Sequence, residues 1–320
     1  MMHAIGVDLG GTKTAAGVVS DTGEVLFSET IPTLNRDGGE AILNATANLV
    51  AGLIGRAAAA GIVVDHVGVG SAGVIDARKG EVVSATDAIL GWAGTAISAG
   101  LAARLDLPPS SIQAVNDVHA HALGEAWTGA AAGTASSLLV AFGTGVGGSY
   151  VLEGAPVLGH RYVGGHVGHF ASPYAFHNGL PLPCVCGGAG HVEAIASGPA
   201  IPEAYRRLGG EAVSPDTRSV FALAANGDAI AIKTIGVAAA AAGQAVGGLV
   251  NILDPEVVVV SGGLSDAGAP WWRPMERAVR AELLPALAGI PVLTASLGNA
   301  AAIAGAARLV LTPATILQRN

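Results

Sequence analysis

Short apolar runs separated by glycine-rich turns open the chain and recur along it. The first three runs, Ile5–Leu9, Thr14–Val19 and Val25–Thr30, predict a meander of β-strands. Later apolar runs predict further strands at Val67–Gly70, Ile112–Val115, Leu138–Phe142, Ser149–Leu152 and Val257–Val260. Helical patterns lie between and after them, at residues 38–60, 101–107, 117–127, 197–224, 227–253 and 299–311. Strands that alternate with helices predict an α/β fold.

A strand, a glycine turn and a second strand occur twice in the same order. The first turn holds Gly10 and Gly11, followed by Thr12 and Lys13, and the second is Gly143–Gly148. Glycine lets the backbone approach an anion closely, although one such turn is equally consistent with an ordinary tight hairpin. Two of them, one in each half of the chain, predict two related α/β halves that each present a hairpin to one nucleotide.

Composition narrows the class of protein. The 320 residues include 47 glycines and only 4% aromatic residues, which favours close helix packing and glycine loops. The net charge of −8 argues against a nucleic-acid-binding surface. The start of the chain lacks the pattern of a signal peptide, and the apolar run Val237–Leu253, which contains Gln244, predicts a core helix and no membrane partner. These features predict a cytoplasmic protein.

Metal-ligand chemistry concentrates in residues 164–198. This stretch holds both cysteines, Cys184 and Cys186, four of the nine histidines, and the carboxylate Glu193. Two cysteines one residue apart do not resemble a secreted disulfide framework. The stretch indicates a metal site, and the alternative is two buried free thiols beside unrelated histidines.

Three loops at strand ends are further candidates for ligand binding. Asp117 follows a strand directly after Asn116 and opens a helix, where a carboxylate serves as a helix cap or as a catalytic base. The small-residue loop Ser71–Asp76, with Gly73, and the turn Ser261–Gly263 leave backbone groups open to a ligand. An ordinary turn is the alternative for both.

The motifs in this order resemble the ROK family (repressors, open reading frames and sugar kinases). The resemblance covers nearly the whole chain, and its carriers are Asp8-Leu-Gly-Gly-Thr-Lys13, Asn116-Asp117, Gly143–Gly148, Gly165-His-Val-Gly-His169, Cys184-Val-Cys-Gly-Gly-Ala-Gly-His-Val-Glu193 and Ser261-Gly-Gly263. It implies the actin-like ATPase (ribonuclease H-like) fold, with two α/β domains around a cleft. The expected domains are 1–117 plus about 299–320, which is smaller, and 118–298, which carries a zinc-binding loop.

The resemblance implies ATP-dependent phosphorylation of a hexose-type sugar at its 6-hydroxyl. Asp117 is then the general base that accepts the sugar proton, and Asp8 orients hydrated Mg²⁺. The implied nucleotide-binding residues are Asp8, Gly10, Gly11, Thr12, Lys13, Thr144, Gly145, Gly147, Gly262 and Gly263. The implied sugar-binding residues are Gly73, Asn116, Asp117, His166, His169 and Glu193. The resemblance also implies a homodimer.

The family pattern for a structural zinc is a histidine followed by Cys-x-Cys-Gly-x-x-Gly-Cys. Here the corresponding residues are His169, Cys184, Cys186 and His191, so a histidine replaces the third cysteine. Two thiolates and two imidazoles form an ordinary tetrahedral zinc set. The long gap between His169 and Cys184 contains His177, which leaves open which histidines take part.

Two departures bear on the substrate. Glucokinase-like members carry Glu-x-Gly-His where this chain has His166-Val-Gly-His169, and Asp87–Leu90 alters the family's Pro-Asn stretch before Gly91-Trp92. A carboxylate only accepts hydrogen bonds, whereas a neutral histidine also donates one. The pattern looks most like bacterial N-acetylmannosamine kinases, with glucokinase or N-acetylglucosamine kinase as the alternative. A non-catalytic ROK sugar sensor or regulator is a further alternative, against which the near-terminal Asp8 and the retained Asp117 argue.

Overall fold

The computed structural model describes residues 2–86, 88–211 and 216–311, and it confirms the predicted α/β class. Asp87 and the end of the predicted first domain, 312–320, lie outside the described residues. The strands are β1 (His3–Leu9), β2 (Lys13–Ser20), β3 (Val25–Pro32), β4 (Val67–Ser71), β5 (Val74–Asp76), β6 (Glu81–Ser84), β7 (Ile112–Asn116), β8 (Ser136–Phe142), β9 (Val146–Leu152), β10 (Ala155–Pro156), β11 (Phe176–His177), β12 (Leu180–Pro181), β13 (Val257–Ser261) and β14 (Val292–Thr294). The helices are α1 (Gly38–Ala59), α2 (Ile97–Leu105), α3 (Asp117–Thr128), α4 (Glu193–Ala196), α5 (Ala200–Arg207), α6 (Thr217–Ala225), α7 (Ala229–Leu253), α8 (Ala269–Glu282) and α9 (Ala300–Leu311).

The chain forms two compact units. The first unit comprises Met1–Ser136, Ser149–Gly165 and Ala295–Asn320, and the second comprises Ser137–Gly148 and His166–Thr294. Helix α3 therefore belongs to the first unit. The domain boundary after Asp117 stays a prediction.

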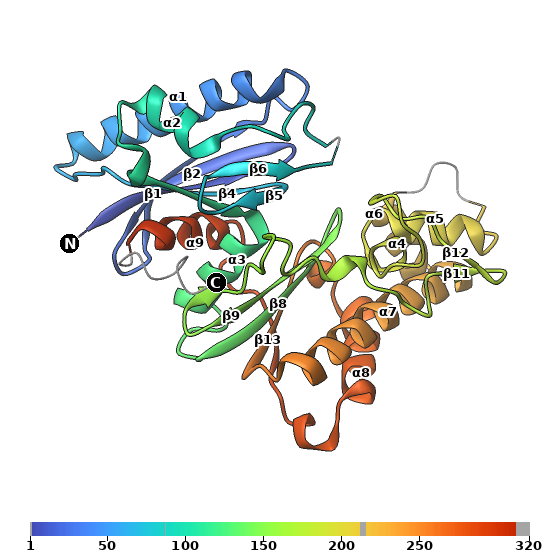
Figure 1. The fold of residues 1–320 in the computed structure, drawn as a ribbon. Coiled ribbons are helices and arrows are strands. Elements are labelled where there is room, and N and C mark those ends of the chain that lie inside the picture. The colour runs from blue at the N-terminus through green and yellow to red at the C-terminus, as the bar shows by residue number, and fades with distance from the viewer. Residues whose placement is uncertain (1, 87, 212–215, 312–320) are drawn as a thin grey trace. The chain divides into compact units, whose positions relative to one another are not determined.

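The first unit is built on a sheet of order β3-β2-β1-β4-β7. The first three strands are antiparallel neighbours, as the meander predicted, and β1, β4 and β7 run parallel. Helices α1 and α2 lie on one side of this sheet, and α3 and α9 lie on the other (Figure 1). Strands β1, β2, β4 and β7 are therefore largely buried on both faces, which explains their apolar runs, whereas the edge strand β3 is partly exposed.

Glycines allow α9 to press against the sheet and against α3. A Cβ atom added at Gly68 would lie 1.7 Å from the Ala306 carbonyl oxygen, and one at Gly305 would lie 1.7 Å from that of Ala120. Real Cβ atoms cannot approach backbone so closely, so these positions need glycine for packing. The abundance of glycine in the sequence thus serves the core as well as the loops.

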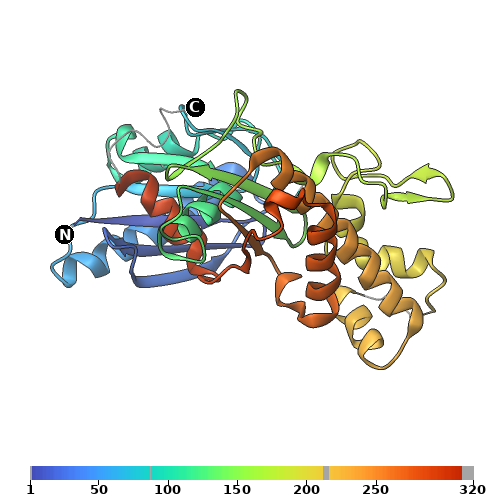
Figure 2. The same ribbon diagram turned by 90° about the horizontal axis from the view of Figure 1, so that it is seen from below.

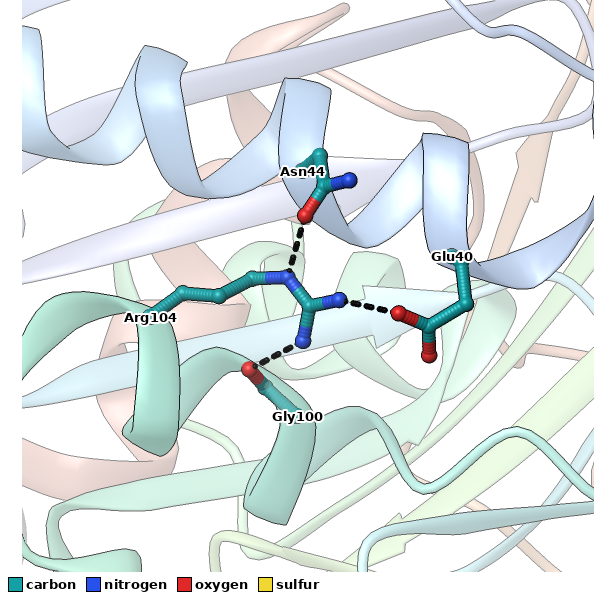
Figure 3. Close-up of polar contacts among 4 residues, drawn as sticks. All are labelled: Glu40, Asn44, Gly100 and Arg104. Atoms are coloured by element: carbon teal, nitrogen blue, oxygen red, sulfur yellow. Dashed lines mark hydrogen bonds and ion pairs between the residues drawn. The ribbon is translucent and has the colours of Figure 1, made fainter.

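Arg104 on α2 ties that helix to α1 (Figure 3). Its guanidinium donates from Nε to Asn44 Oδ1 at 2.7 Å and from Nη2 to Glu40 Oε2 at 2.6 Å. Nη1 donates to the Gly100 carbonyl at 2.8 Å, within α2 itself. The charged side chain therefore links α2 to α1 on the same side of the sheet (Figure 1).

The second sheet has the order β10-β9-β8-β13-β14 and repeats the topology of the first. A hairpin, β8 and β9, is followed in the sheet by strands that run parallel to β8 and to each other, namely β13 and β14. The chain passes from the second unit into the first within β9. This repetition confirms the prediction of two related α/β halves.

In the second unit, α7 and α8 pack side by side in both views (Figure 1, Figure 2). By length and composition α1 and α7 are apolar enough to cross a membrane, and 44% and 56% of their most apolar windows are buried inside the protein. Gly243 and Gly247 of α7 face the backbone of α8 at Met275 and Val279. The small residues of this apolar run thus allow close packing between two helices.

One predicted helix is wrong in its extent. Residues 197–224 do not form a continuous helix, because Ser197 adopts an extended conformation after α4 and Gly209 has a φ of +90° after α5. Asp216 then starts α6 with a capping box. Its side chain accepts from the Ser219 N–H, and the Ser219 hydroxyl oxygen accepts from the Asp216 N–H. The sequence pattern did not predict β5, β6, β10, β14, α4, α8 or the small hairpin of β11 and β12.

Candidate active site and Cys/His cluster

Parallel register brings the candidate residues of the first unit to one edge of its sheet. Leu9 pairs with Ser71, and Ser71 pairs with Asn116, so the carboxyl ends of β1, β4 and β7 are level. Asp8 lies one residue before this edge, and Asp117 lies one residue after it. Residues far apart in the sequence thus form one half-site.

Asn116 and Asp117 are both held at the start of α3. Asn116 is the N-cap, and its Oδ1 accepts from the Val118 N–H at 3.0 Å, while its Nδ2 donates to the Gly73 carbonyl at 3.0 Å. Asp117 Oδ1 also accepts from the Val118 N–H, at 2.9 Å. The positive end of the helix dipole favours a carboxylate here. The cap interpretation therefore holds for Asn116, and Asp117 gains a fixed position.

Asp8 is a buried carboxyl with a perturbed pKa. Burial, and after it the negative charge of Asp117, raise its pKa from 3.8 to about 6, while Lys13 opposes the rise. Two carboxylates that interact in this way resist being ionised together, unless a cation lies beside them. Their arrangement suits a divalent cation, and carboxylate oxygens are the ligands that Mg²⁺ prefers.

Two residues that sequence reasoning missed hold the first glycine hairpin, Gly10–Lys13. Thr33 donates from Oγ1 to the Gly10 carbonyl at 2.9 Å, and its N–H donates to the Thr12 carbonyl at 3.0 Å. Asn35 donates from Nδ2 to the Gly11 carbonyl at 2.8 Å. Hydrogen bonds to three of its carbonyls thus hold the backbone of the hairpin in place. No sequence signal marked Thr33 or Asn35, because both follow β3 and lie more than 20 residues from the hairpin.

The loop that carries Gly73 is held by Trp92. The buried indole donates from Nε1 to the Ala72 carbonyl at 3.1 Å and to Ser71 Oγ at 3.3 Å. Gly73 has a φ of +100°, and a Cβ atom there would lie 2.8 Å from the Ser84 carbonyl oxygen. This position therefore requires glycine for its conformation, whatever it binds.

In the second unit, Glu193 lies against the second glycine hairpin, Gly143–Gly148. Its Oε2 accepts from the Val146 N–H at 2.7 Å, and the side chain is 9% exposed. A Cβ atom at Gly145 would lie 2.6 Å from the same oxygen. Gly145 therefore leaves room for a carboxylate that comes from the far end of the loop 164–198.

The turn after β13 lies beside the same hairpin. Gly262 has a φ of +86°, and a Cβ atom there would lie 2.4 Å from the carbonyl oxygen of Phe142, the last residue of β8. The Gly198 N–H donates to the Gly143 carbonyl at 2.8 Å. Gly262, Gly263 and the hairpin are thus gathered at one place, as a nucleotide subsite in this unit requires.

The four predicted metal ligands, the Cys/His cluster, converge in the second unit. One ligand atom of each of His169, Cys184, Cys186 and His191 lies within 4.8 Å of the others. The sulfur of Cys184 is 3.6 Å from His169 Nδ1, and that of Cys186 is 3.3 Å from His191 Nδ1. In a tetrahedral zinc site, sulfur and nitrogen ligands are about 3.6 Å apart, given the usual bond lengths. The cluster therefore fits one zinc ion.

Backbone turns bring the cluster together. The Gly187 N–H donates to the Cys184 carbonyl at 3.0 Å, and the Cys184 N–H donates to the Gly188 carbonyl at 2.9 Å. A Cβ atom at Gly188 would lie 2.6 Å from His191 Cε1, so only glycine admits the imidazole. His177, which the sequence left as an alternative ligand, lies in β11 and outside the cluster.

His166 lies beside the cluster and has no place among its four ligands. Its ring is stacked on that of His169, with centroids 6.3 Å apart. His169 directs Nδ1 toward Cys184, which leaves Nε2 as its second functional atom. One imidazole can thus serve the cluster with one nitrogen and another ligand with the other.

Comparisons with known proteins agree with the resemblance that the sequence motifs indicated. The ROK family profile matches residues 4–313. Glucokinase from Thermotoga maritima is 32% identical over 322 residues, which cover 97% of each chain. N-acetyl-D-glucosamine kinase from Escherichia coli O1:K1 / APEC is 32% identical over 313 residues, which cover 96% of this chain and 99% of that protein.

A solved structure shares the fold. The crystal structure of a ROK family glucokinase from Streptomyces griseus in complex with glucose and AMPPNP matches with a TM-score of 0.78 and 29% identity, covering 96% of this chain and 98% of that one. The fold is the actin-like ATPase fold with two domains, as predicted.

Proposed function

This chain belongs to the ROK family and is a sugar kinase of that family, and we propose that it transfers the γ-phosphoryl group of ATP to the 6-hydroxyl of N-acetyl-D-mannosamine. The observation that supports phosphoryl transfer is the placement of Asp117. The carboxylate is fixed at the start of α3, beside Asp8 and at the same sheet edge as the first glycine hairpin. A role as helix cap would not explain why Asp117 lies beside these groups, since Asn116 already caps the helix.

In this proposal Asp117 accepts the proton of the 6-hydroxyl as its oxygen attacks the γ-phosphorus. Proton removal raises the nucleophilicity of the oxygen, and most of the remaining rate comes from positioning and charge neutralisation. Asp8 would hold hydrated Mg²⁺, which neutralises phosphate charge when bound. The residues proposed to position ATP are Gly10, Gly11, Thr12, Lys13, Thr144, Gly145, Gly147, Gly262 and Gly263.

The proposed sugar ligands are Gly73, Asn116, Asp117, His166, His169 and Glu193. The carboxylate of Glu193 accepts hydrogen bonds from hydroxyl groups, while Nε2 of His169 donates one, because a neutral imidazole that binds the metal through Nδ1 carries its proton on Nε2. The Cys/His cluster would hold a structural zinc that fixes the loop carrying these side chains.

His166 supports N-acetyl-D-mannosamine over glucose. A neutral imidazole can donate to an N-acyl carbonyl, which the carboxylate of glucokinase-like members cannot do. The second candidate is glucose or N-acetyl-D-glucosamine, because relatives with these names are 32% identical over nearly the whole chain. A homodimer is proposed on the family resemblance alone, and light scattering of the purified protein measures it.

A coupled ADP-release assay with ATP tests the proposal directly. The sugars are N-acetyl-D-mannosamine, N-acetyl-D-glucosamine and glucose at matched concentrations. We expect the highest kcat/KM for N-acetyl-D-mannosamine. A higher value for glucose would remove the sugar assignment and leave the kinase, whereas sugar binding without ADP release for any hexose would favour a non-catalytic sensor.

A further inference from the structure

A buried guanidinium nitrogen without a hydrogen-bond partner lies in the second unit, on a side chain that none of the sites described above uses. Nη2 of Arg207, the last residue of α5, is buried and has no hydrogen-bond partner among the described residues. The side chain as a whole is half-buried, and a polar atom that leaves water without a hydrogen-bond partner costs free energy. Such a group calls for an explanation, and an absent ion is one of the usual ones.

Arg207 shares its one acidic neighbour on α5 with Arg206. Glu203, one turn earlier on α5, forms its ion pair with Arg206. Burial lowers the pKa of Arg207, Glu203 raises it, and Arg206 lowers it again. Arg207 therefore carries a positive charge that its own helix does not neutralise.

A small cavity of about 90 Å³ lies at Arg207 and has a cationic character. Lys233 of α7 and His177 of β11 also line it, together with Tyr174, Thr234 and apolar side chains. No Asp or Glu is among the described residues that line it. A larger cavity of about 370 Å³ also reaches Arg207, but Glu193 and Glu203 line that one, so it disfavours anions. The charges of the lining residues therefore favour an anion in the smaller cavity.

We propose that this small cavity, the Arg207 cavity, binds a phosphate group between Arg207 and Lys233. A planar guanidinium gives paired hydrogen bonds to phosphate oxygens, and an ammonium adds charge. The volume admits the phosphate group itself, so a larger ligand extends outside. The phosphate comes from inorganic phosphate or from a phosphomonoester such as a sugar phosphate.

The site goes beyond the proposed kinase activity and does not depend on it. It also lies against the loop of the Cys/His cluster, because Leu182 and Ile195 line the same cavity. Leu182 is two residues before Cys184, and Ile195 is two residues after Glu193. An occupant would therefore stabilise the segment that carries the Cys/His cluster.

Thermal unfolding of the full-length protein against inorganic phosphate tests the site. Phosphate is expected to raise the Tm of the wild type, and Arg207→Met is expected to weaken the apparent phosphate affinity at least tenfold. Arg218→Met is the matched control, since Arg218 of α6 is exposed and lines neither cavity, and its affinity should stay within twofold. Any phosphate bound at the glycine hairpins is common to all three proteins and cancels in the comparison.

Lys233→Met keeps the test decisive if Arg207→Met fails to fold, because Lys233 is exposed. It should weaken phosphate severalfold without changing the Tm in phosphate-free buffer. Unchanged phosphate affinity in both variants would overturn the proposal. So would an Arg207→Met protein whose loss of Tm is equal with and without phosphate, because that result marks a structural role. Repeating the titration with glucose 6-phosphate distinguishes the two sources of the phosphate.

Discussion

The carboxylate of Glu193 accepts a hydrogen bond from the backbone N–H of Val146, with 2.7 Å between the two atoms. This bond joins the loop of the Cys/His cluster to the second glycine hairpin. The other carboxylate oxygen is 4.0 Å from Cys184 Sγ, so the same side chain also lies against the cluster. Metal ligands, a proposed sugar ligand and a proposed phosphate-binding hairpin thus form one connected structure within the second unit.

Substitution of Glu193 should separate its structural role from its proposed role in sugar binding. Glu193→Ala leaves the buried Val146 N–H without its acceptor, which costs about 1–3 kcal/mol. Glu193→Gln keeps an acceptor oxygen and should retain most of the Tm. Both variants are expected to raise the sugar KM at least tenfold. Equal Tm values for the two variants would argue against the importance of the bond to Val146.

Metal content should follow the geometry of the cluster. We expect about one zinc per chain in the purified protein by plasma mass spectrometry, and its loss in Cys184→Ser and His191→Ala. His177→Ala is the matched control, because this histidine belongs to the same loop but lies outside the cluster. Zinc loss in His177→Ala equal to that in His191→Ala would show that the sequence alternative was correct.

Asp117→Asn tests the general base. The amide keeps an oxygen that can accept from the Val118 N–H, so α3 should start normally and the sugar should still bind. Without a base, kcat is expected to fall by about 10²–10⁴-fold. Calorimetry for sugar binding and a coupled assay for turnover measure the two effects. Turnover near the wild-type rate would remove Asp117 from this role.

Asp8 predicts a pH-dependent stability in the absence of Mg²⁺. Its pKa of about 6 in the folded protein lies above the ordinary 3.8, so folding favours the protonated carboxyl. The stabilisation is complete below about pH 3.8 and is lost as pH rises through about 6. A rise of this size in the pKa corresponds to roughly 3 kcal/mol in the free energy of unfolding.

Asp8→Asn should therefore stabilise the metal-free protein relative to wild type at pH 8, by up to roughly 3 kcal/mol, and by much less at pH 4. The same variant should lose kinase activity, because the proposed site for hydrated Mg²⁺ is removed. Urea unfolding at a series of pH values measures the difference. A difference that stays constant between pH 4 and pH 8 would contradict the pKa assignment.

His166→Glu tests the substrate proposal. The substitution restores the carboxylate of glucokinase-like members, so an N-acyl carbonyl would meet an acceptor instead of a donor. The ratio of kcat/KM for N-acetyl-D-mannosamine to that for glucose should fall at least tenfold. His177→Glu serves as the control for added charge in the same loop. An unchanged ratio in His166→Glu would separate substrate choice from this histidine.

Local pattern determined the strands, most helices and the chemistry of the site residues. The runs around Val67–Ser71 and Val257–Ser261 are apolar because both faces of each sheet are covered, so they were visible without a structure. The motif Cys184-Val-Cys186 with His191 also lies within eight residues, where turn geometry alone brings ligands together.

Only the tertiary structure decided which distant residues support these motifs. Thr33 and Asn35 hold the first hairpin, and Trp92 holds the Gly73 loop, through bonds that span about 20 residues or more. Side chains of these types carry no local signal, because any Thr, Asn or Trp would look the same in a sequence. The raised pKa of Asp8 likewise arises from burial and from Asp117, 109 positions away in the chain. Proximity in space creates both effects, and the order of residues does not encode it locally.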